Sequence, residues 1–480
     1  MLLFLLSAPP IHSCRRASLN GQLFLVGGDQ SLVTGDEVKT MPPPSLFLAP
    51  LLAFAFASAT TTAPLPTART LVDGARGHGH RLKSKTFLSP PLSLRPGSVS
   101  NKWYTDVDFP RGHLALKSFN GELVDARGAP VPLHETYLHH WLVEPYYVHA
   151  ARGGGGSDGE RLPRANSGVC KGSLGQYFGL GSETRRTATW VPDPYGVEIG
   201  GGGDAPAGYE ERWSLNVHAI DTRGAADKPG CTECRCDLYN VTVDDDEGYA
   251  GGLRCCYDQA RCRVGADFVD GEARELFLRY TVMWVDWSDA AAAVVPVRIY
   301  ILDVTDTALL DGKPDPDCKV EYTVEECSSE NRAKNDCVDV KVTKEVLPHG
   351  GNIVFAVGHQ HAGGIGTSLH GQDGRLLCSS TPIYGDGEEA GNEAGYVVGM
   401  STCYPEPGAA KVRGGEALTV LSNYTGERRR TGVMGHFYLL VADDDEQQQA
   451  APNNKQPSAP CFSLFPASWC VPAWLLGNLQ

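Results

Sequence analysis

A series of short runs rich in β-branched and aromatic residues restricts the fold of this chain more than any other feature of its sequence. Runs of this kind are typical of β-strands, and the glycine- and proline-rich segments between them favour turns and loops. Sustained helical periodicity is scarce, and the 55 glycines and 32 prolines agree with a loop-rich β protein. The sequence therefore predicts an all-β fold, with strands at residues 137–148, 211–219, 276–287, 294–304, 352–361, 375–378, 396–400, 417–423 and 433–441.

Two segments carry more detailed expectations. Hydrophobic and polar residues alternate along residues 211–219, which predicts a half-buried strand with Asn216 and His218 on its polar face. Residues 114–123 contain Asn120-Gly121, a pair that favours a hairpin turn.

The N-terminal region has the features of a targeting signal. Residues 41–59 contain an apolar core followed by Ala57-Ser58-Ala59, a small-residue cleavage site, and are interpreted as a signal peptide. Met41 would then be the true start and residues 1–40 an upstream extension, which is favoured over an unusually long leader. A buried apolar segment is the alternative to a signal peptide. Secretion to the extracellular space is expected.

The cysteines agree with export. The sequence has 15, and loss of Cys14 with the leader would leave an even number, which favours a disulfide framework. The spacing around residues 231–236 would also suit zinc, but disulfides are the preferred interpretation, with adjacent Cys255 and Cys256 joined to different partners. Asn240 and Asn423 begin glycosylation sequons. The disulfide candidates are Cys170, Cys231, Cys234, Cys236, Cys255, Cys256, Cys262, Cys318, Cys327, Cys337, Cys378, Cys403, Cys461 and Cys470.

Charge and motifs exclude several classes of function. The net charge of −15 provides no basic surface for a nucleic acid, and no segment after the leader is long and apolar enough to span a bilayer. The sequence has no Gly-x-Ser-x-Gly elbow, no His-Glu-x-x-His helix and no Walker loop, so the corresponding hydrolases, metalloproteases and nucleotide-binding proteins fit badly.

The run at residues 352–361 ends in His359-Gln-His361. Side chains alternate faces along a strand, so these two imidazoles leave on the same side and can reach one metal ion. A His-x-His pair alone is weak evidence, because histidine also occurs in ordinary cores and surfaces.

Further donors follow in chain order. His139-His140 and His218 precede the pair, and in residues 433–440 the strand period places Met434, His436 and Tyr438 on one face. A thioether with two imidazoles suits copper, especially Cu(I), better than zinc, magnesium or calcium, whereas three imidazoles would suit copper or zinc. The candidate metal ligands are His139, His140, His218, His359, His361 and Met434.

This order resembles the copper type II, ascorbate-dependent monooxygenases, typified by peptidylglycine α-hydroxylating monooxygenase. The local sequences around His218, at residues 358–364 and at residues 415–434 are similar too. The resemblance implies two jelly-roll-like antiparallel β-sandwich domains in tandem with cysteine-rich insertions. The first, residues 101–290, would hold an electron-transfer copper on His139, His140 and His218. The second, residues 291–442, would bind and activate dioxygen on copper at His359, His361 and Met434, distant from the first site, with Tyr438 contacting the substrate and ascorbate as the reductant.

The sequence departs from that pattern at several positions. Val357 stands where the monooxygenase has an arginine that holds a peptide carboxylate, so a glycine-extended peptide is a poor substrate for this chain. His436 replaces an asparagine and is a possible extra ligand. His139 and His140 would point to opposite faces of a regular strand, so both can reach one metal only where the strand ends or bulges.

Residues 60–100 are expected to be a linker or extended arm, and residues 443–480 a disordered tail.

Over nearly its whole length the chain also resembles the plant stress-up-regulated nodulin-type family. Tyr-Leu-His-His-Trp at residues 137–141, Gly-Gln-Tyr-Phe-Gly-Leu-Gly at 175–181 and Gly-His-Gln-His at 358–361 carry the resemblance, which implies a stress response but no mechanism. Three hypotheses remain: a copper monooxygenase, a copper-binding protein without that activity, and a non-catalytic extracellular interaction module.

Overall fold

The computed structural model describes residues 82–150, 161–201, 205–242, 249–290, 294–334 and 336–443, which belong to one compact unit. The expected upstream extension, signal peptide, nearly all of the expected tail, Cys14, Cys461 and Cys470 lie outside these ranges.

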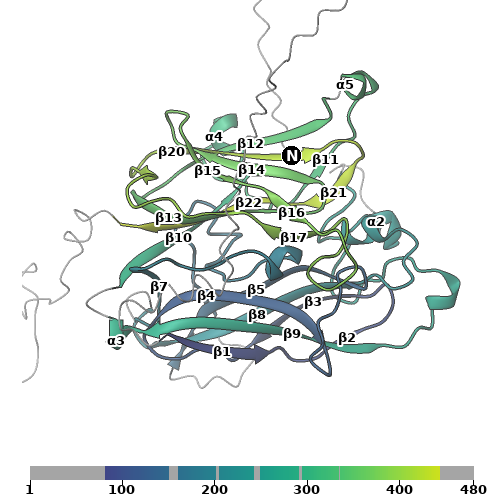
Figure 1. Cartoon of the computed structure of the whole chain (residues 1–480), viewed down its shortest axis with the longest axis horizontal. Helices are drawn as coiled ribbons and strands as arrows, with labels where there is room; N and C mark the ends of the chain where they lie inside the picture. Colours follow the sequence, from purple (N-terminus) through teal and green to yellow (C-terminus); the bar gives the residue numbers. More distant parts are fainter. Residues whose placement is uncertain are drawn as a thin grey trace, which may run out of the picture. The chain divides into compact units, whose positions relative to one another are not determined.

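The largest sheet joins strands from both halves of the chain (Figure 1). Its order is β1-β9-β4-β7-β10-β22-β13-β18, and its pairs are antiparallel except β7 with β10. Short strands β2 and β19 add to β9 and β13. The bounds are β1 Lys83–Leu88, β2 Leu92–Leu94, β4 Leu114–Asp125, β7 Tyr195–Ile199, β9 Arg274–Asp286, β10 Val295–Asp303, β13 Gly351–Gln360, β18 Thr402–Cys403, β19 Lys411–Val412 and β22 Gly435–Ala442.

Two four-stranded sheets pack against this one, with orders β3-β8-β5-β6 and β12-β20-β14-β15. The first contains β3 Val99–Thr105, β5 Thr136–His149, β6 Leu162–Pro163 and β8 Tyr209–Asp221. The second contains β12 Val338–Val346, β14 Gly364–His370, β15 Leu376–Ser380 and β20 Ala417–Thr425. Small ladders join β11 Tyr322–Val324 to β21 Arg430–Val433, and β16 Pro382–Tyr384 to β17 Val397–Met400. Short helices are α2 Lys228–Thr232, α3 Trp287–Ala290, α4 Ala308–Asp311, α5 Ser329–Ala333, η3 Ser182–Arg185, η4 Cys236–Leu238 and η6 Ala266–Phe268.

Strands β10, β22 and β13 form what we call the central layer, because both of its faces are buried. Along β22, Phe437, Leu439 and Val441 enter one hydrophobic core, whereas Tyr438 and Leu440 enter another. The first core lies against the sheet of β12, β20, β14 and β15, and the second is shared with the N-terminal half of the chain. The strand period thus directs alternate side chains of β22 into two different cores.

The predicted all-β class is confirmed, as are strands at the main predicted runs, including β5, β9 and β10. The hairpin at Asn120-Gly121 is wrong, because β4 runs through both residues. A Cβ atom at Gly121 would lie 2.8 Å from the Trp141 ring. The glycine therefore leaves room for the indole and does not form a turn.

Two further expectations differ from the structure. Part of the expected linker at residues 60–100 forms β1 and β2, which pair with β9 and bury Phe87 and Leu92. Strand β8 is also not half-buried: from Trp213 onward it is buried on both faces, and His218 is 0% exposed. Its polar face is covered because histidines of the C-terminal half pack near it.

Six disulfides join described cysteines. They are Cys170–Cys318, Cys231–Cys262, Cys234–Cys256, Cys236–Cys255, Cys327–Cys337 and Cys378–Cys403. The neighbours Cys255 and Cys256 bond to different partners, as predicted. The described cysteines are therefore joined to one another as disulfides, the interpretation preferred over zinc.

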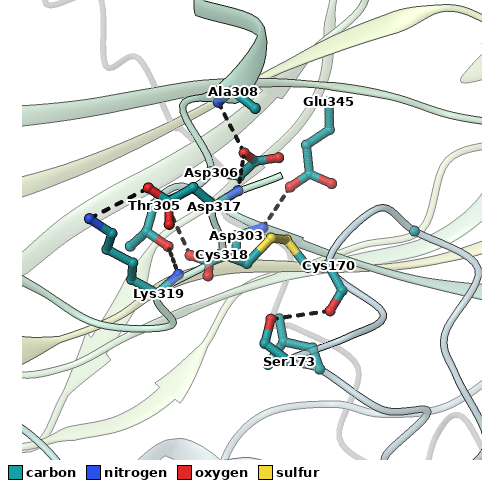
Figure 2. The surroundings of a disulfide bond; sticks show 12 residues. Cys170, Ser173, Asp303, Thr305, Asp306, Ala308, Asp317, Cys318, Lys319 and Glu345 are labelled. Atoms are coloured by element: carbon teal, nitrogen blue, oxygen red, sulfur yellow. Dashed lines mark hydrogen bonds and ion pairs between the residues drawn. A yellow bond between two sulfur atoms is a disulfide. The ribbon is translucent and has the colours of Figure 1, made fainter. Parts of the chain in front are cut away.

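The Cys170–Cys318 bond connects a loop of the N-terminal half to a loop of the C-terminal half (Figure 2). Buried carboxylates surround it, and their oxygens accept backbone N–H groups: Asp303 from Val320, and Asp306 from Ala308. The disulfide and these hydrogen bonds therefore fix the loop that carries Cys318 and Val320.

We expect the double substitution Cys170→Ser/Cys318→Ser to lower the free energy of unfolding by about 2–4 kcal/mol, because the bond spans 148 residues and restricts the unfolded chain. Cys327→Ser/Cys337→Ser is the matched control, since that bond spans only 10 residues and should cost less. Denaturant unfolding measures both. Equal losses would contradict the role given to the longer connection.

Candidate metal centre

A bulge in β5 brings His139 and His140 together. In the pairing of β5 with β8, Leu138 lies opposite Ala219 and His140 opposite His218, so that His139 is the extra residue. The two Nδ1 atoms of His139 and His140 are 3.3 Å apart. The condition stated from the sequence, a bulge at this pair, is therefore met.

His218 completes this first group. Its ring centroid is 4.4 Å from that of His139 and 5.0 Å from that of His140. One nitrogen of each of the three rings lies within 4.8 Å of the others, a spacing that one metal ion can bridge.

The second group is built on β13 and the chain preceding β22. The rings of His359 and His361 are 5.2 Å apart, as the strand period predicted. His359 pairs with His436 and Gln360 with Gly435, and His361 and Met434 are the next residues beyond this ladder. The Tyr424 hydroxyl fixes this arrangement, because it accepts the His361 N–H and donates to the Met434 carbonyl, both at 2.7 Å.

The two groups are in contact, which the sequence analysis did not anticipate. The ring centroids of His139 and His361 are 4.6 Å apart. On the other side, the ring of His436 stacks 5.8 Å from that of His359. The expected distant pair of sites is instead a continuous cluster of imidazoles, because the central layer packs directly on the N-terminal half.

Four histidines of the cluster, His139, His140, His218 and His361, are held in the neutral form. Burial, followed by repulsion from neighbouring imidazoles, lowers the pKa values of His139, His218 and His361 well below the ordinary range. Burial lowers the pKa of His140 to about 4. Neutral imidazoles carry a lone pair on one ring nitrogen, the form in which histidine binds metals.

Several ring nitrogens in this cluster have no hydrogen-bond partner. Within the described residues, these are Nε2 of His139, both ring nitrogens of His218 and Nε2 of His361, all buried. Leaving a buried polar atom unpaired costs about 1–3 kcal/mol. One nitrogen from each of His139, His140 and His218 lies close enough to the others to bind one metal ion, which would satisfy one nitrogen of each ring it binds.

A buried carboxylate orients His359. Glu183, on η3 and 0% exposed, has Oε1 2.5 Å from His359 Nδ1, and its Oε2 accepts the Gly181 N–H at 3.0 Å. Burial raises the pKa of Glu183, but His359 and the Gly181 amide outweigh it and lower that pKa overall. The carboxylate accepts the Nδ1 proton, so the Nε2 lone pair of His359 is available to a metal.

An amide orients His140 in the same way. Nδ2 of Asn216 donates to Asn101 Oδ1 and to the Lys102 carbonyl, so its Oδ1 accepts from His140 Nε2 at 2.7 Å. The proton then lies on Nε2, and the Nδ1 lone pair of His140 faces His139.

Sequence reasoning missed Glu183, Tyr424 and the role of Asn216. No motif marks Glu183, because its partner His359 lies far away in sequence. Tyr424 falls within residues 415–434, but its contact with His361 spans 63 residues and has no local signal. Asn216 carried a signal, since it shares the polar face of β8 with His218.

His436 has a different environment. Its Nε2 lies 3.1 Å from the Val320 carbonyl, which can only accept, so Nε2 carries the proton. Burial lowers the pKa of this histidine although Asp303 opposes the shift. Any ligand role for His436 would therefore fall to Nδ1.

A cavity of about 240 Å³ opens beside the cluster. His140, His359, His436 and Met434 line it, as does Tyr438, whose hydroxyl donates to the Tyr177 carbonyl at 3.3 Å. His139, His218 and His361 are not among its lining residues. The cluster thus has one edge open to a small molecule and one edge sealed in the core.

Other groups of possible ligand atoms occur in the described residues, but they fit a metal less well. Cys234 and Cys256 lie near His218, and Cys170 lies near Asp306 and Glu345, yet all three cysteines are bonded in disulfides. Burial raises the pKa of Glu345 well above its ordinary range, which favours a neutral carboxyl over a metal ligand.

The fold and this cluster define an all-β, disulfide-linked protein with a buried histidine-rich candidate metal centre. A scan of protein families matches residues 80–444 to the family described as stress up-regulated Nod 19. The chain belongs to the stress up-regulated Nod 19 family. No curated protein matches it, and none of the helices in the described residues is long and apolar enough to cross a membrane.

We expect His218→Leu to stabilise the metal-free protein at neutral pH by about 1–3 kcal/mol, because leucine fills a similar volume without unpaired nitrogens. The variant should also lose less stability in acid. Below the ordinary histidine pKa of about 6.5 the unfolded chain binds protons that the buried, neutral imidazoles do not, so stability falls as pH falls.

Thermal unfolding between pH 4 and 8 measures both effects, with His370→Leu as the control outside the cluster. A variant less stable than the parent at pH 7.5 would show that the imidazole contributes to the fold without a metal.

Proposed function

We propose that this protein binds copper through the histidine cluster and Met434, and that the bound metal supports ascorbate-dependent oxidation of the monooxygenase type. The observation that carries the proposal is the set of buried imidazole nitrogens that have no partner in the described residues. A protein rarely keeps several such atoms in its core unless a ligand satisfies them.

The donor set favours copper over other metals. The cluster consists of imidazoles beside one thioether, and the nearest carboxylate, Glu183, is occupied by His359 Nδ1 and the Gly181 amide. Calcium and magnesium prefer oxygen ligands, whereas imidazole and thioether suit copper, including Cu(I). The three histidines would also suit zinc, but the Met434 thioether would add little to the affinity for zinc.

The open and sealed edges suggest different roles. His359 and Met434 line the cavity, so metal held there would be within reach of dioxygen and a small substrate. His139 and His218 lie on the sealed edge and His140 lies at the cavity, so these three histidines would hold a second metal that serves as the electron donor. The contact between His139 and His361 provides a short connection between the two groups.

When bound, copper would supply the one-electron chemistry and dioxygen activation, and the protein would position the reactants. Overall, a substrate C–H bond and O2, with two electrons and one proton from the ascorbate anion and one proton from solvent, would give an alcohol, water and dehydroascorbate. Tyr438 lines the cavity and would contact the substrate.

A copper-binding role without oxidation is the second candidate. One observation favours it: the two histidine groups touch, whereas the monooxygenase resemblance implies separate sites. Export through the secretory pathway is proposed for either function, because the disulfide framework needs an oxidising compartment.

We expect the protein expressed from Met41 through a secretory route to retain at least one copper per molecule. His139→Ala and His361→Ala should reduce the retained copper, whereas His370→Ala should not. Equilibrium dialysis with metal analysis gives the stoichiometry, and circular dichroism confirms folding.

A folded parent that retains no copper at micromolar concentrations would overturn the proposal. Ascorbate-dependent oxygen uptake with a panel of small substrates separates the two candidates, since only the oxidative function predicts substrate-dependent uptake.

We expect Glu183→Gln to weaken copper affinity about 10- to 100-fold, because the amide oxygen can still accept the His359 proton but lacks the charge that makes the imidazole a stronger donor. Glu345→Gln, another buried carboxyl, should leave the affinity unchanged. Competition with a Cu(I) chelator measures both variants. Equal affinities for Glu183→Gln and the parent would remove Glu183 from the metal centre.

A further inference from the structure

The cavity beside the cluster has walls of uniform character. Among the described residues that line it there is no aspartate, glutamate, lysine or arginine. Leu142, Leu174, Leu180 and Val357 provide apolar surface, and the aromatic rings of Tyr177, Tyr438 and Trp103 provide more. A charged ligand entering this space would lose its hydration without meeting a counter-ion, which is strongly unfavourable.

The polar side chains of the wall are largely engaged with the protein. The Asn216 amide is occupied by Asn101, Lys102 and His140. The Ser173 hydroxyl donates to the Cys170 carbonyl at 3.2 Å. A ligand with many hydrogen-bonding groups would therefore find few partners in the wall. An apolar ligand could bind without breaking the hydrogen bonds of Asn216 and Ser173.

The histidines at the cavity use ring nitrogens for contacts with the protein. His140 Nε2 is hydrogen-bonded to Asn216 Oδ1, His436 Nε2 to the Val320 carbonyl, and His359 Nδ1 to the Glu183 carboxylate. These nitrogens are therefore not open to a charged group of a ligand.

The size of the cavity limits its ligand. Its volume of about 240 Å³ exceeds the roughly 150 Å³ of a protein cavity that holds benzene and is below the roughly 300–1,000 Å³ of usual ligand pockets. Trp103 is 55% exposed and lies on β3, so it can form a rim between the cavity and solvent.

We propose that this cavity binds a neutral, largely apolar small molecule about the size of one or two fused aromatic rings. The binding of this molecule does not depend on the proposed function. Its role as the substrate of the copper centre rests on that function. The ligand would lie between the apolar wall around Val357 and the edge formed by His359 and Met434.

The test uses the metal-free full chain and three probes of the same ring size: 1-naphthol, which is neutral at pH 7, 1-naphthoate and 1-naphthylmethylammonium. Fluorescence titration measures each affinity. We expect 1-naphthol to bind at least tenfold more tightly than either ion. Equal affinities, tighter binding of an ion, or no saturable binding of 1-naphthol would overturn the proposal.

Variants locate the probe in this cavity. Val357→Arg should weaken 1-naphthol and strengthen 1-naphthoate, because it adds a cation to the wall. Leu142→Phe is the milder change, should the arginine variant not fold, and should weaken 1-naphthol at least fivefold by filling space. Leu309→Phe, on an exposed helix, is the control.

If Leu142→Phe leaves 1-naphthol binding unchanged, the probe binds elsewhere and the proposal fails. Because these titrations contain no metal, their outcome is independent of copper retention. Failure of the copper experiment would remove the substrate role and leave the cavity as a binding site.

Discussion

The two-sided burial of the central layer is the constraint on which the candidate site depends. Along β22, Phe437, Leu439 and Val441 pack into the C-terminal core, so the strand period commits the alternate positions to the opposite face. That face carries His436 and Tyr438 and lies against the N-terminal half of the chain. A register shift of one residue would exchange the two faces and move the polar side chains into the wrong core. The metal donors are thus placed by the same packing that holds the two halves together.

Burial also gives the imidazoles their chemical character. Removal from water and mutual repulsion keep His139, His218 and His361 neutral, and the same removal leaves their nitrogens without partners. In the metal-free protein this arrangement costs stability, because leucine would fill the space at lower cost. Glu183 and Asn216 add to the specificity, since each removes one of the two tautomers of a neighbouring histidine. Hydrogen bonds that fix the orientation of buried polar side chains, at a cost in stability, are characteristic of sites that bind a ligand.

Local features of the site could be predicted from the sequence, and long-range ones could not. The period of a strand is enough to place His359 and His361 on one side, and the adjacency of His139 and His140 is enough to require a bulge. The hairpin turn predicted at Asn120-Gly121 is wrong, because the tertiary contact of Gly121 with Trp141 overrides the local turn preference. The contact between His139 and His361, the carboxylate of Glu183 and the hydroxyl of Tyr424 join segments far apart in the sequence. No spacing rule reports such contacts, because they depend on how two sheets pack.

The apolar cavity and the neutral histidines follow from one physical cause. A cationic side chain at position 357 would stand next to His359 in β13, where it would attract an anion and disfavour a protonated imidazole. Valine at this position provides no charge that could hold an anionic substrate. Excluding water keeps the ring nitrogens unprotonated and available as donors, and it makes the entry of a charged molecule costly. The proposed preference for neutral ligands and the proposed metal binding would therefore share one cause, because water that enters this cavity would oppose both.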